Sequence, residues 1–127
     1  MTDPIARLDS LVFDCPDPDR LATFWQTVLN YRPHRRDPEW VTIADATDST
    51  RRLSFQRVDD YRPPTWPDDQ RPQQVHLDLL VSDLPVADQQ VLAAGATHLS
   101  EVIVHEDETF RVFADPAGHP FCLIQSH

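Results

Sequence analysis

The chain has 127 residues, a common size for a single domain with one hydrophobic core. It carries 11 Lys and Arg against 21 Asp and Glu, so its net charge of -10 repels nucleic acid and anionic membranes. The sequence contains neither an apolar stretch of membrane-spanning length nor an N-terminal signal-peptide core. Cysteine is sparse, as in reducing compartments, with only Cys15 and Cys122. We therefore expect a soluble, cytoplasmic, single-domain protein.

The first half of the chain predicts one helix among four strands. Residues 8–14 have the period-2 pattern of a strand with two different faces, Leu11 and Phe13 on one and Ser10, Val12 and Asp14 on the other. A helix follows, because Asp17 suits its N-cap and Pro18 its first position. Its apolar face consists of Leu21, Phe24, Trp25, Val28 and Leu29. Three β-prone stretches complete a β-α-β-β-β order within residues 1–58, at residues 32–35, 40–44 and 53–58.

A second half repeats this order after a stiff, proline-rich connector at residues 59–74. A strand at residues 75–81 precedes a helix for which Ser82 and Asp83 offer a cap and which ends at Gly95. Its apolar face holds Leu84, Ala87, Val91 and Ala94. Three strands follow, at residues 97–104, 109–114 and 121–125, with a turn at residues 115–118. A shift of 66 residues lays Ser10 on His76 and Asp17 on Asp83, which indicates an internal duplication with a second half at residues 75–127.

Each predicted element places its apolar side chains on one face, and these faces form the expected core. The core members are Leu11, Phe13, Leu21, Phe24, Trp25, Val28, Leu29, Leu53, Phe55, Leu77, Leu79, Val91, Phe121 and Leu123. His76 and Asp78 lie two residues apart in their strand, so alternation points both side chains away from Leu77 and Leu79.

Four motifs, in order over nearly the whole chain, resemble landmarks of one known family. They are Asp14-Cys15-Pro16-Asp17 with Phe24-Trp25, His76-Leu77-Asp78-Leu79, Leu92-Ala93-Ala94-Gly95-Ala96, and Asp115-Pro116-Ala117-Gly118-His119-Pro120-Phe121-Cys122-Leu123. The chain resembles the glyoxalase-like branch of the vicinal-oxygen-chelate superfamily, which includes bleomycin resistance proteins and dioxygenases. The resemblance implies an α+β fold of two βαβββ repeats, whose curled mixed sheets form an open cup. It also favours a homodimer.

The resemblance further implies a divalent metal in the cup, held by His, Gln or Glu from the first and last strands of the halves. Those positions fall here on Ser10, on Ser54 or Gln56, on His76 and on Cys122. Hard cations bind poorly to such a set, because it contains no carboxylate. We therefore expect no metal and no cofactor, and a cup that binds a small hydrophobic or aromatic molecule.

Two more residues are candidates for contact with the ligand. The Arg111 guanidinium offers a fixed fork of donors, and the Trp40 ring has a face on which an aromatic ligand can stack. The structural alternatives are an exposed strand position for Arg111 and a core position for Trp40. The predicted ligand-binding set is Ser10, Trp40, Gln56, His76, Asp78, Arg111 and Cys122.

The sequence leaves a second function open, that of an enzyme of the lyase, isomerase or dioxygenase type. Such an enzyme would use an atypical metal site, or His76 and Asp78 as an acid-base pair. A third interpretation gives His76 and Asp78 a structural role only. The three interpretations differ in what lies beside His76: a ligand, a metal or another part of the protein.

Overall fold

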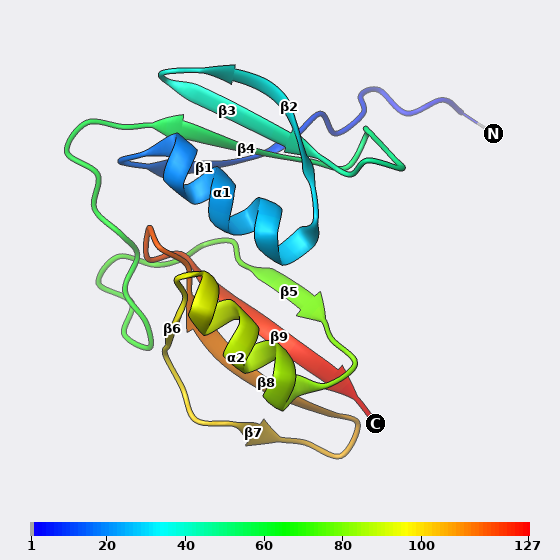
Figure 1. Cartoon of the computed structure of the whole chain (residues 1–127), viewed down its shortest axis with the longest axis vertical. Helices are drawn as coiled ribbons and strands as arrows, with labels where there is room; N and C mark the ends of the chain where they lie inside the picture. The colour runs from blue at the N-terminus through cyan, green and yellow to red at the C-terminus, as the bar shows by residue number, and fades with distance from the viewer. Residues whose placement is uncertain (1) are drawn as a thin grey trace. The chain divides into compact units, whose positions relative to one another are not determined.

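The computed structural model describes residues 2–127 and divides the chain into two compact units. The first unit ends at Tyr61 and the second spans Arg62–His127. Met1, at the start of the first predicted half-repeat, lies outside the described residues. Each unit contains one open mixed sheet with one helix (Figure 1). The predicted α+β fold is confirmed.

The first unit has the predicted β-α-β-β-β order. Its elements are β1 (Leu11–Cys15), α1 (Pro18–Leu29), β2 (Arg32–Asp37), β3 (Trp40–Ala44) and β4 (Arg52–Arg57). The strands lie in the order β1-β4-β3-β2, with β1 parallel to β4 and the other neighbours antiparallel. Helix α1 packs against β3 and β4, in the middle of this sheet (Figure 1).

The second unit follows the same plan with one extra strand. Its elements are β5 (Leu77–Leu80), α2 (Leu84–Ala94), β6 (Thr97–His98), β7 (Ile103–Val104), β8 (Glu108–Ala114) and β9 (Pro120–Ser126). The strands lie in the order β5-β9-β8-β6, and β7 also pairs with β8. Helix α2 packs against β9 (Figure 1).

The prediction of one continuous strand at residues 97–104 is wrong, because β6 and β7 are separate. The amides of Leu99 and Ser100 both donate to the Val112 carbonyl, at 2.9 and 3.3 Å. Two residues therefore face one on the partner strand, which interrupts regular pairing as a bulge does.

Both helices begin at a predicted cap, and α2 ends at the predicted glycine. The Asp17 carboxylate accepts from the Arg20 amide at 3.3 Å, and the Asp83 carboxylate accepts from the Val86 amide at 3.1 Å. Gly95 ends α2 with a φ of 124°, a conformation that a side chain would strain. Within residues 2–127, neither helix combines the length and the apolar character needed to cross a membrane.

The core of each unit lies between its helix and its sheet. In the first unit the rings of Phe13 and Phe55 stack at 5.8 Å, and Trp25 from α1 stacks on Phe13 at 6.4 Å. The predicted core residues that are buried are Phe13, Leu21, Phe24, Trp25, Leu53, Phe55, Val91, Phe121 and Leu123. Five others are only half-buried: Leu11, Val28, Leu29, Leu77 and Leu79.

Candidate functional site

The strand registers show which side chains share the sheet face turned away from the helix. In the first unit, Ser54 pairs with Val12 and Thr42, whereas the neighbouring Phe55 belongs to the core beneath α1. We call the residues that alternate with the core the non-helix face. In the second unit this face includes Asp78 and its partner Cys122.

The registers also settle which position of the first half corresponds to Cys122. Phe13 pairs with Phe55, and Leu79, its counterpart at a shift of 66 residues, pairs with Leu123. Cys122, directly before Leu123, therefore corresponds to Ser54, directly before Phe55. Of the two positions that the sequence leaves open, Ser54 is therefore the counterpart of Cys122, and Gln56 is not.

The non-helix face of the first unit carries a chain of hydrogen bonds between neutral groups. The Ser54 hydroxyl lies 2.6 Å from the Ser10 hydroxyl and 2.8 Å from that of Thr42. The Trp40 indole N–H donates to the Thr42 hydroxyl at 2.9 Å. Ser54 and Thr42 are 1% and 6% exposed. These groups satisfy one another, as buried polar groups must.

Trp40 and Gln56 are cross-strand partners at the far end of the same face. Together with Arg35 and Arg57 they line a hollow of about 450 Å³. The Trp40 ring is half-buried, and Gln56 is exposed. The structure therefore brings these two predicted residues together.

The non-helix face of the second unit carries ionisable groups instead. His76 Nε2 lies 3.2 Å from Asp78 Oδ1, and these two side chains are 40% and 55% exposed. Their shared orientation agrees with the strand alternation. One ligand atom from each of His76, Asp78 and Cys122 falls within 4.8 Å of the other two. We call these three residues the His-Asp-Cys cluster.

The Cys122 thiol in this cluster has a raised pKa. Burial, followed by the charge of Asp78 and a hydrogen bond to its carboxylate, raises the pKa of Cys122 to about 11. The thiol is therefore neutral at pH 7. Cys122 and Cys15 are both free of disulfide bonds.

Arg111 does not share a face with the His-Asp-Cys cluster, so the structure does not bring it together with the other predicted site residues of the second unit. It pairs with Leu123, on the α2 side of the sheet. Its Nε donates to the Ser100 carbonyl at 2.8 Å, and its Nη1 donates to Asp88 Oδ2 at 2.9 Å. Asp88 Oδ1 also lies 2.7 Å from His98 Nε2. Arg111 is thus one partner in a largely buried ion pair, and both partners line a pocket of about 610 Å³ on this side of the sheet.

The sequence contained two indications of this ion pair. Asp88 lies four residues after Leu84 and three before Val91, which is the spacing of one helix face. Arg111 lies two residues before the buried Phe113, which is the spacing of one strand face. Together, these spacings place both charges at the interface between α2 and its sheet.

The two units share the order of their elements, the aspartate caps of their helices and the pairing of their first and last strands. This arrangement defines a protein of two βαβββ repeats. The family model of the glyoxalase-like domain matches residues 10–124, and the chain belongs to this family. Among curated proteins, none is significantly similar in sequence.

Solved structures of low sequence identity share the fold. A glyoxalase/bleomycin resistance protein/dioxygenase family enzyme from Burkholderia phytofirmans PsJN has a TM-score of 0.74 and 16% identity, over 96% of this chain and 100% of that chain. The fosfomycin resistance protein FosX from Listeria monocytogenes has a TM-score of 0.73 and 13% identity, over 98% and 96%. A glyoxalase-related enzyme from Fulvimarina pelagi has a TM-score of 0.69 and 16% identity, over 95% and 88%. At these identities the comparisons establish the fold alone.

The side chains at the four ligand positions do not fit the divalent metal that the superfamily resemblance implies. Ser10 and Ser54 are neutral and bond to each other, and the Cys122 thiol keeps its proton. His76 already faces the Asp78 carboxylate. A hard cation needs several charged oxygen donors, whereas these positions supply none.

Proposed function

We propose that this chain is a metal-free glyoxalase-like protein that binds a small hydrophobic or aromatic molecule. The observation that carries the proposal is the closeness of Cys122 to the partly exposed pair of His76 and Asp78, with one ligand atom of each within 4.8 Å of the other two. An imidazole, a carboxylate and a thiol offer both donors and acceptors to a ligand. The His-Asp-Cys cluster is therefore suited to orient a polar group of a bound molecule.

Apolar side chains on the same face support an apolar ligand. Leu80 pairs with Ile124, and Ile124 pairs with Phe110 across the next strand. Leu80 is 79% exposed, while Ile124 and Phe110 are half-buried. Small-molecule sites commonly combine such apolar lining with a few polar groups.

Titration with a fluorescent aromatic probe, 1-anilinonaphthalene-8-sulfonate, together with amide chemical shifts, tests this proposal. We expect saturable binding, with the largest shift changes at Leu80, Cys122 and Ile124. His76→Ala should weaken binding several-fold, whereas His34→Ala, which removes an exposed imidazole in the first unit, should leave it unchanged. Equal effects of the two variants, or shifts confined to other strands, would refute the proposal.

The close approach of the three ligand atoms favours one alternative, an atypical metal centre for an enzyme. Nitrogen, oxygen and sulfur donors within 4.8 Å of one another form a set that zinc accepts. The Cys122 thiol would then have to lose its proton, against a pKa of about 11. Calorimetric titration with zinc distinguishes the two functions. Stoichiometric, micromolar binding that His76→Ala abolishes and His34→Ala retains would make the enzyme the better proposal.

We also propose that the protein is a cytoplasmic homodimer. The edge strand β2 is fully exposed and carries Arg32, Pro33, Arg35 and Arg36, which discourage pairing with another strand. The edge strand β5 of the second sheet has one charged residue, Asp78, among three leucines, so it is better suited to pair with a second copy. Sedimentation at tens of micromolar protein should give twice the mass of one chain, and a monomer there would count against the dimer. Neither Cys15 nor Cys122 forms a disulfide bond, which supports a reducing compartment such as the cytoplasm.

A further inference from the structure

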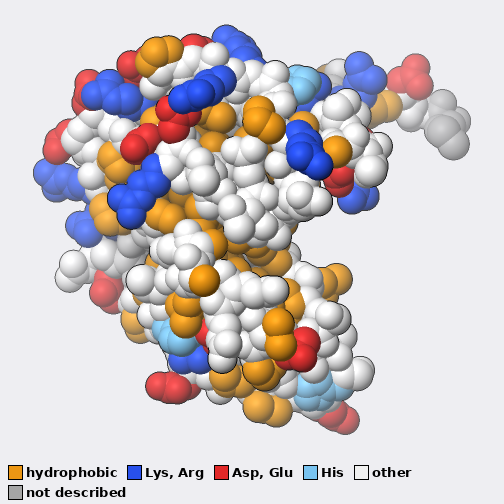
Figure 2. All heavy atoms as spheres, in the orientation of Figure 1, with side chains coloured by type: hydrophobic (Ala, Val, Ile, Leu, Met, Phe, Trp, Pro, Cys, Tyr) orange, Lys and Arg blue, Asp and Glu red, His pale blue; other side chains and the backbone are white. Residues whose placement is uncertain are grey.

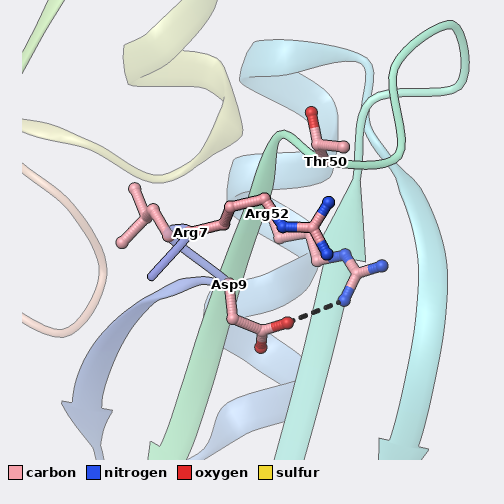
Figure 3. Close-up of a pocket in the computed structure, with 5 residues that line it drawn as sticks. Arg7, Asp9, Thr50 and Arg52 are labelled. Carbon is pink, nitrogen blue, oxygen red and sulfur yellow. Dashed lines mark hydrogen bonds and ion pairs between the residues drawn. The ribbon is translucent and has the colours of Figure 1, made fainter. Parts of the chain in front are cut away.

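We propose that a pocket in the first unit, at the start of β4, binds a small oxyanion, namely a phosphate or carboxylate group. The pocket has a volume of about 440 Å³ and is lined by Arg7, Leu8, Asp9, Thr50 and Arg52. Figure 3 shows the guanidinium groups of Arg7 and Arg52 extending toward the same side of this pocket. The proposal does not rest on the function proposed above, because all five residues belong to the first unit.

Arg52 is held in place for this role by two fixed contacts. Its Nε donates to the Ser49 carbonyl at 2.7 Å, and its Nη1 donates to Asp9 Oδ1 at 3.1 Å (Figure 3). The side chain is 26% exposed, so it is partly shielded from water. A guanidinium carries five N–H donors, and these two contacts leave others for a ligand.

Arg7 brings a second positive charge to the pocket without a counter-charge of its own. Within residues 2–127, no carboxylate lies within ion-pair distance of the Arg7 guanidinium. The pocket therefore has two guanidinium groups and one carboxylate, that of Asp9, in a chain whose net charge is -10. In Figure 2 the blue arginine side chains gather on the first unit, which holds eight of the eleven arginines.

An oxyanion suits this arrangement because it relieves the repulsion between the two cations. Guanidinium groups pair with carboxylates and phosphates through parallel N–H donors, and such charge-assisted bonds are stronger than neutral ones. The exposed Leu8 adds an apolar wall to the pocket. A ligand with a negatively charged end and a carbon skeleton matches this lining.

Titration of the full chain with sodium phosphate and, separately, sodium acetate tests the proposal at constant ionic strength. The readout is the Nε–H resonance of each arginine. We expect saturable shifts at Arg7 and Arg52, caused by phosphate alone or by both anions. If phosphate gave no saturable shift at these two arginines, the proposal would be overturned.

Variants of the pocket make the test specific. Arg7→Gln should weaken binding about tenfold, in line with the loss of one charge-assisted hydrogen bond, and it alters only an exposed residue outside the sheet. Asp9→Asn should strengthen binding, because it removes a competing carboxylate. Arg20→Gln, a change of an exposed arginine on α1, serves as the matched control. Equal affinity in all three variants would show that binding occurs elsewhere and would also overturn the proposal.

Discussion

The two units build the same sheet and helix but place different chemistry at corresponding positions. Ser10 and Ser54 of the first unit correspond to His76 and Cys122 of the second. The serines bond to each other at 2.6 Å in a satisfied chain, whereas the His-Asp-Cys cluster remains partly exposed. The neighbouring pairs on the helix side of the two sheets, Phe13 with Phe55 and Leu79 with Leu123, are both apolar. This difference indicates that the scaffold depends on the core pairs and that the non-helix face is free to change chemistry.

The helix sides of the two sheets also differ. Aromatic rings fill the interface in the first unit, where Phe24 meets Trp25 edge-on at 5.0 Å. In the second unit, Asp88 and Arg111 place a charge pair at the same kind of interface, with side chains 12% and 17% exposed. The first unit has an ion pair between helix and sheet, Asp19 with Arg36, on the exposed surface. The second unit instead places an ion pair inside the interface, where its partners depend on each other.

The largest effect on stability is expected from removing an aromatic ring from the core of the first unit. Phe24→Ala should lower the free energy of unfolding by about 3–5 kcal/mol, because the ring is 2% exposed and its loss leaves a cavity. Urea denaturation followed by circular dichroism measures this loss. Thr27→Ala, on the exposed side of α1, should change stability by less than about 0.5 kcal/mol. A Phe24→Ala loss below about 1 kcal/mol would contradict the packing described for this unit.

The next effect concerns the charge pair of the second unit. Asp88→Ala should cost about 2–4 kcal/mol, because it leaves the Arg111 guanidinium largely buried without its counter-charge. The double variant Asp88→Ala/Arg111→Met should recover part of this loss, which a double-mutant cycle measures. Gln89→Ala, an exposed neighbour on α2, is the control. Strict additivity of the two substitutions would show that the pair contributes no coupling.

Local chemistry made much of this fold predictable from the sequence. The caps at Asp17 and Asp83 and the turn at residues 115–118 depend on side chains that bond to backbone a few residues away. In that turn, the Asp115 carboxylate accepts from the amides of Ala117 and His119, both at 2.9 Å. Such contacts require no knowledge of distant segments.

The position of the first half that corresponds to Cys122 could not be derived in this way, because it depends on pairing between distant strands. Ser54 and Gln56 are two residues apart, so strand alternation puts both on one face and cannot choose between them. The shift from Ser10 to His76 is 66 residues, whereas that from Ser54 to Cys122 is 68. The halves therefore differ by two residues in the segments between their first and last strands.

A smaller effect is expected from the hydroxyl chain of the first unit. Ser54→Ala should cost about 1–3 kcal/mol, because the hydroxyls of Ser10 and Thr42 each lose a partner while Thr42 stays buried. Thermal unfolding and urea titration both report this change. Ser49→Ala removes an exposed hydroxyl from the same unit and should be neutral. If Ser54→Ala were neutral too, the hydrogen bonds among these hydroxyls would not stabilise the fold. The contrast with the second unit would then be wrong.

The smallest effect on stability is expected at Asp78. Asp78→Asn should change the free energy of unfolding by no more than about 1 kcal/mol at pH 7, because its pair with His76 is exposed to solvent. The same substitution should lower the pKa of Cys122 from about 11, because the carboxylate is one cause of its elevation. The remaining elevation comes mainly from burial, so the pKa should stay above the ordinary value of 9.0.

This pKa also fixes the pH dependence of stability. The folded protein binds the Cys122 proton more tightly than the unfolded chain, so this contribution is fully present below pH 9 and is lost as the pH rises toward 11. In Asp78→Asn this contribution to stability should be lost at a lower pH, and in Cys122→Ala it should be absent. Thiolate absorbance near 240 nm and urea titrations between pH 8 and 11 measure both changes. Glu108→Gln should lower the pKa less, because Glu108 is the smallest of the four causes. An unchanged Cys122 pKa in Asp78→Asn would mean that these two groups do not interact in solution. The His-Asp-Cys cluster would then be wrong as the proposed ligand site.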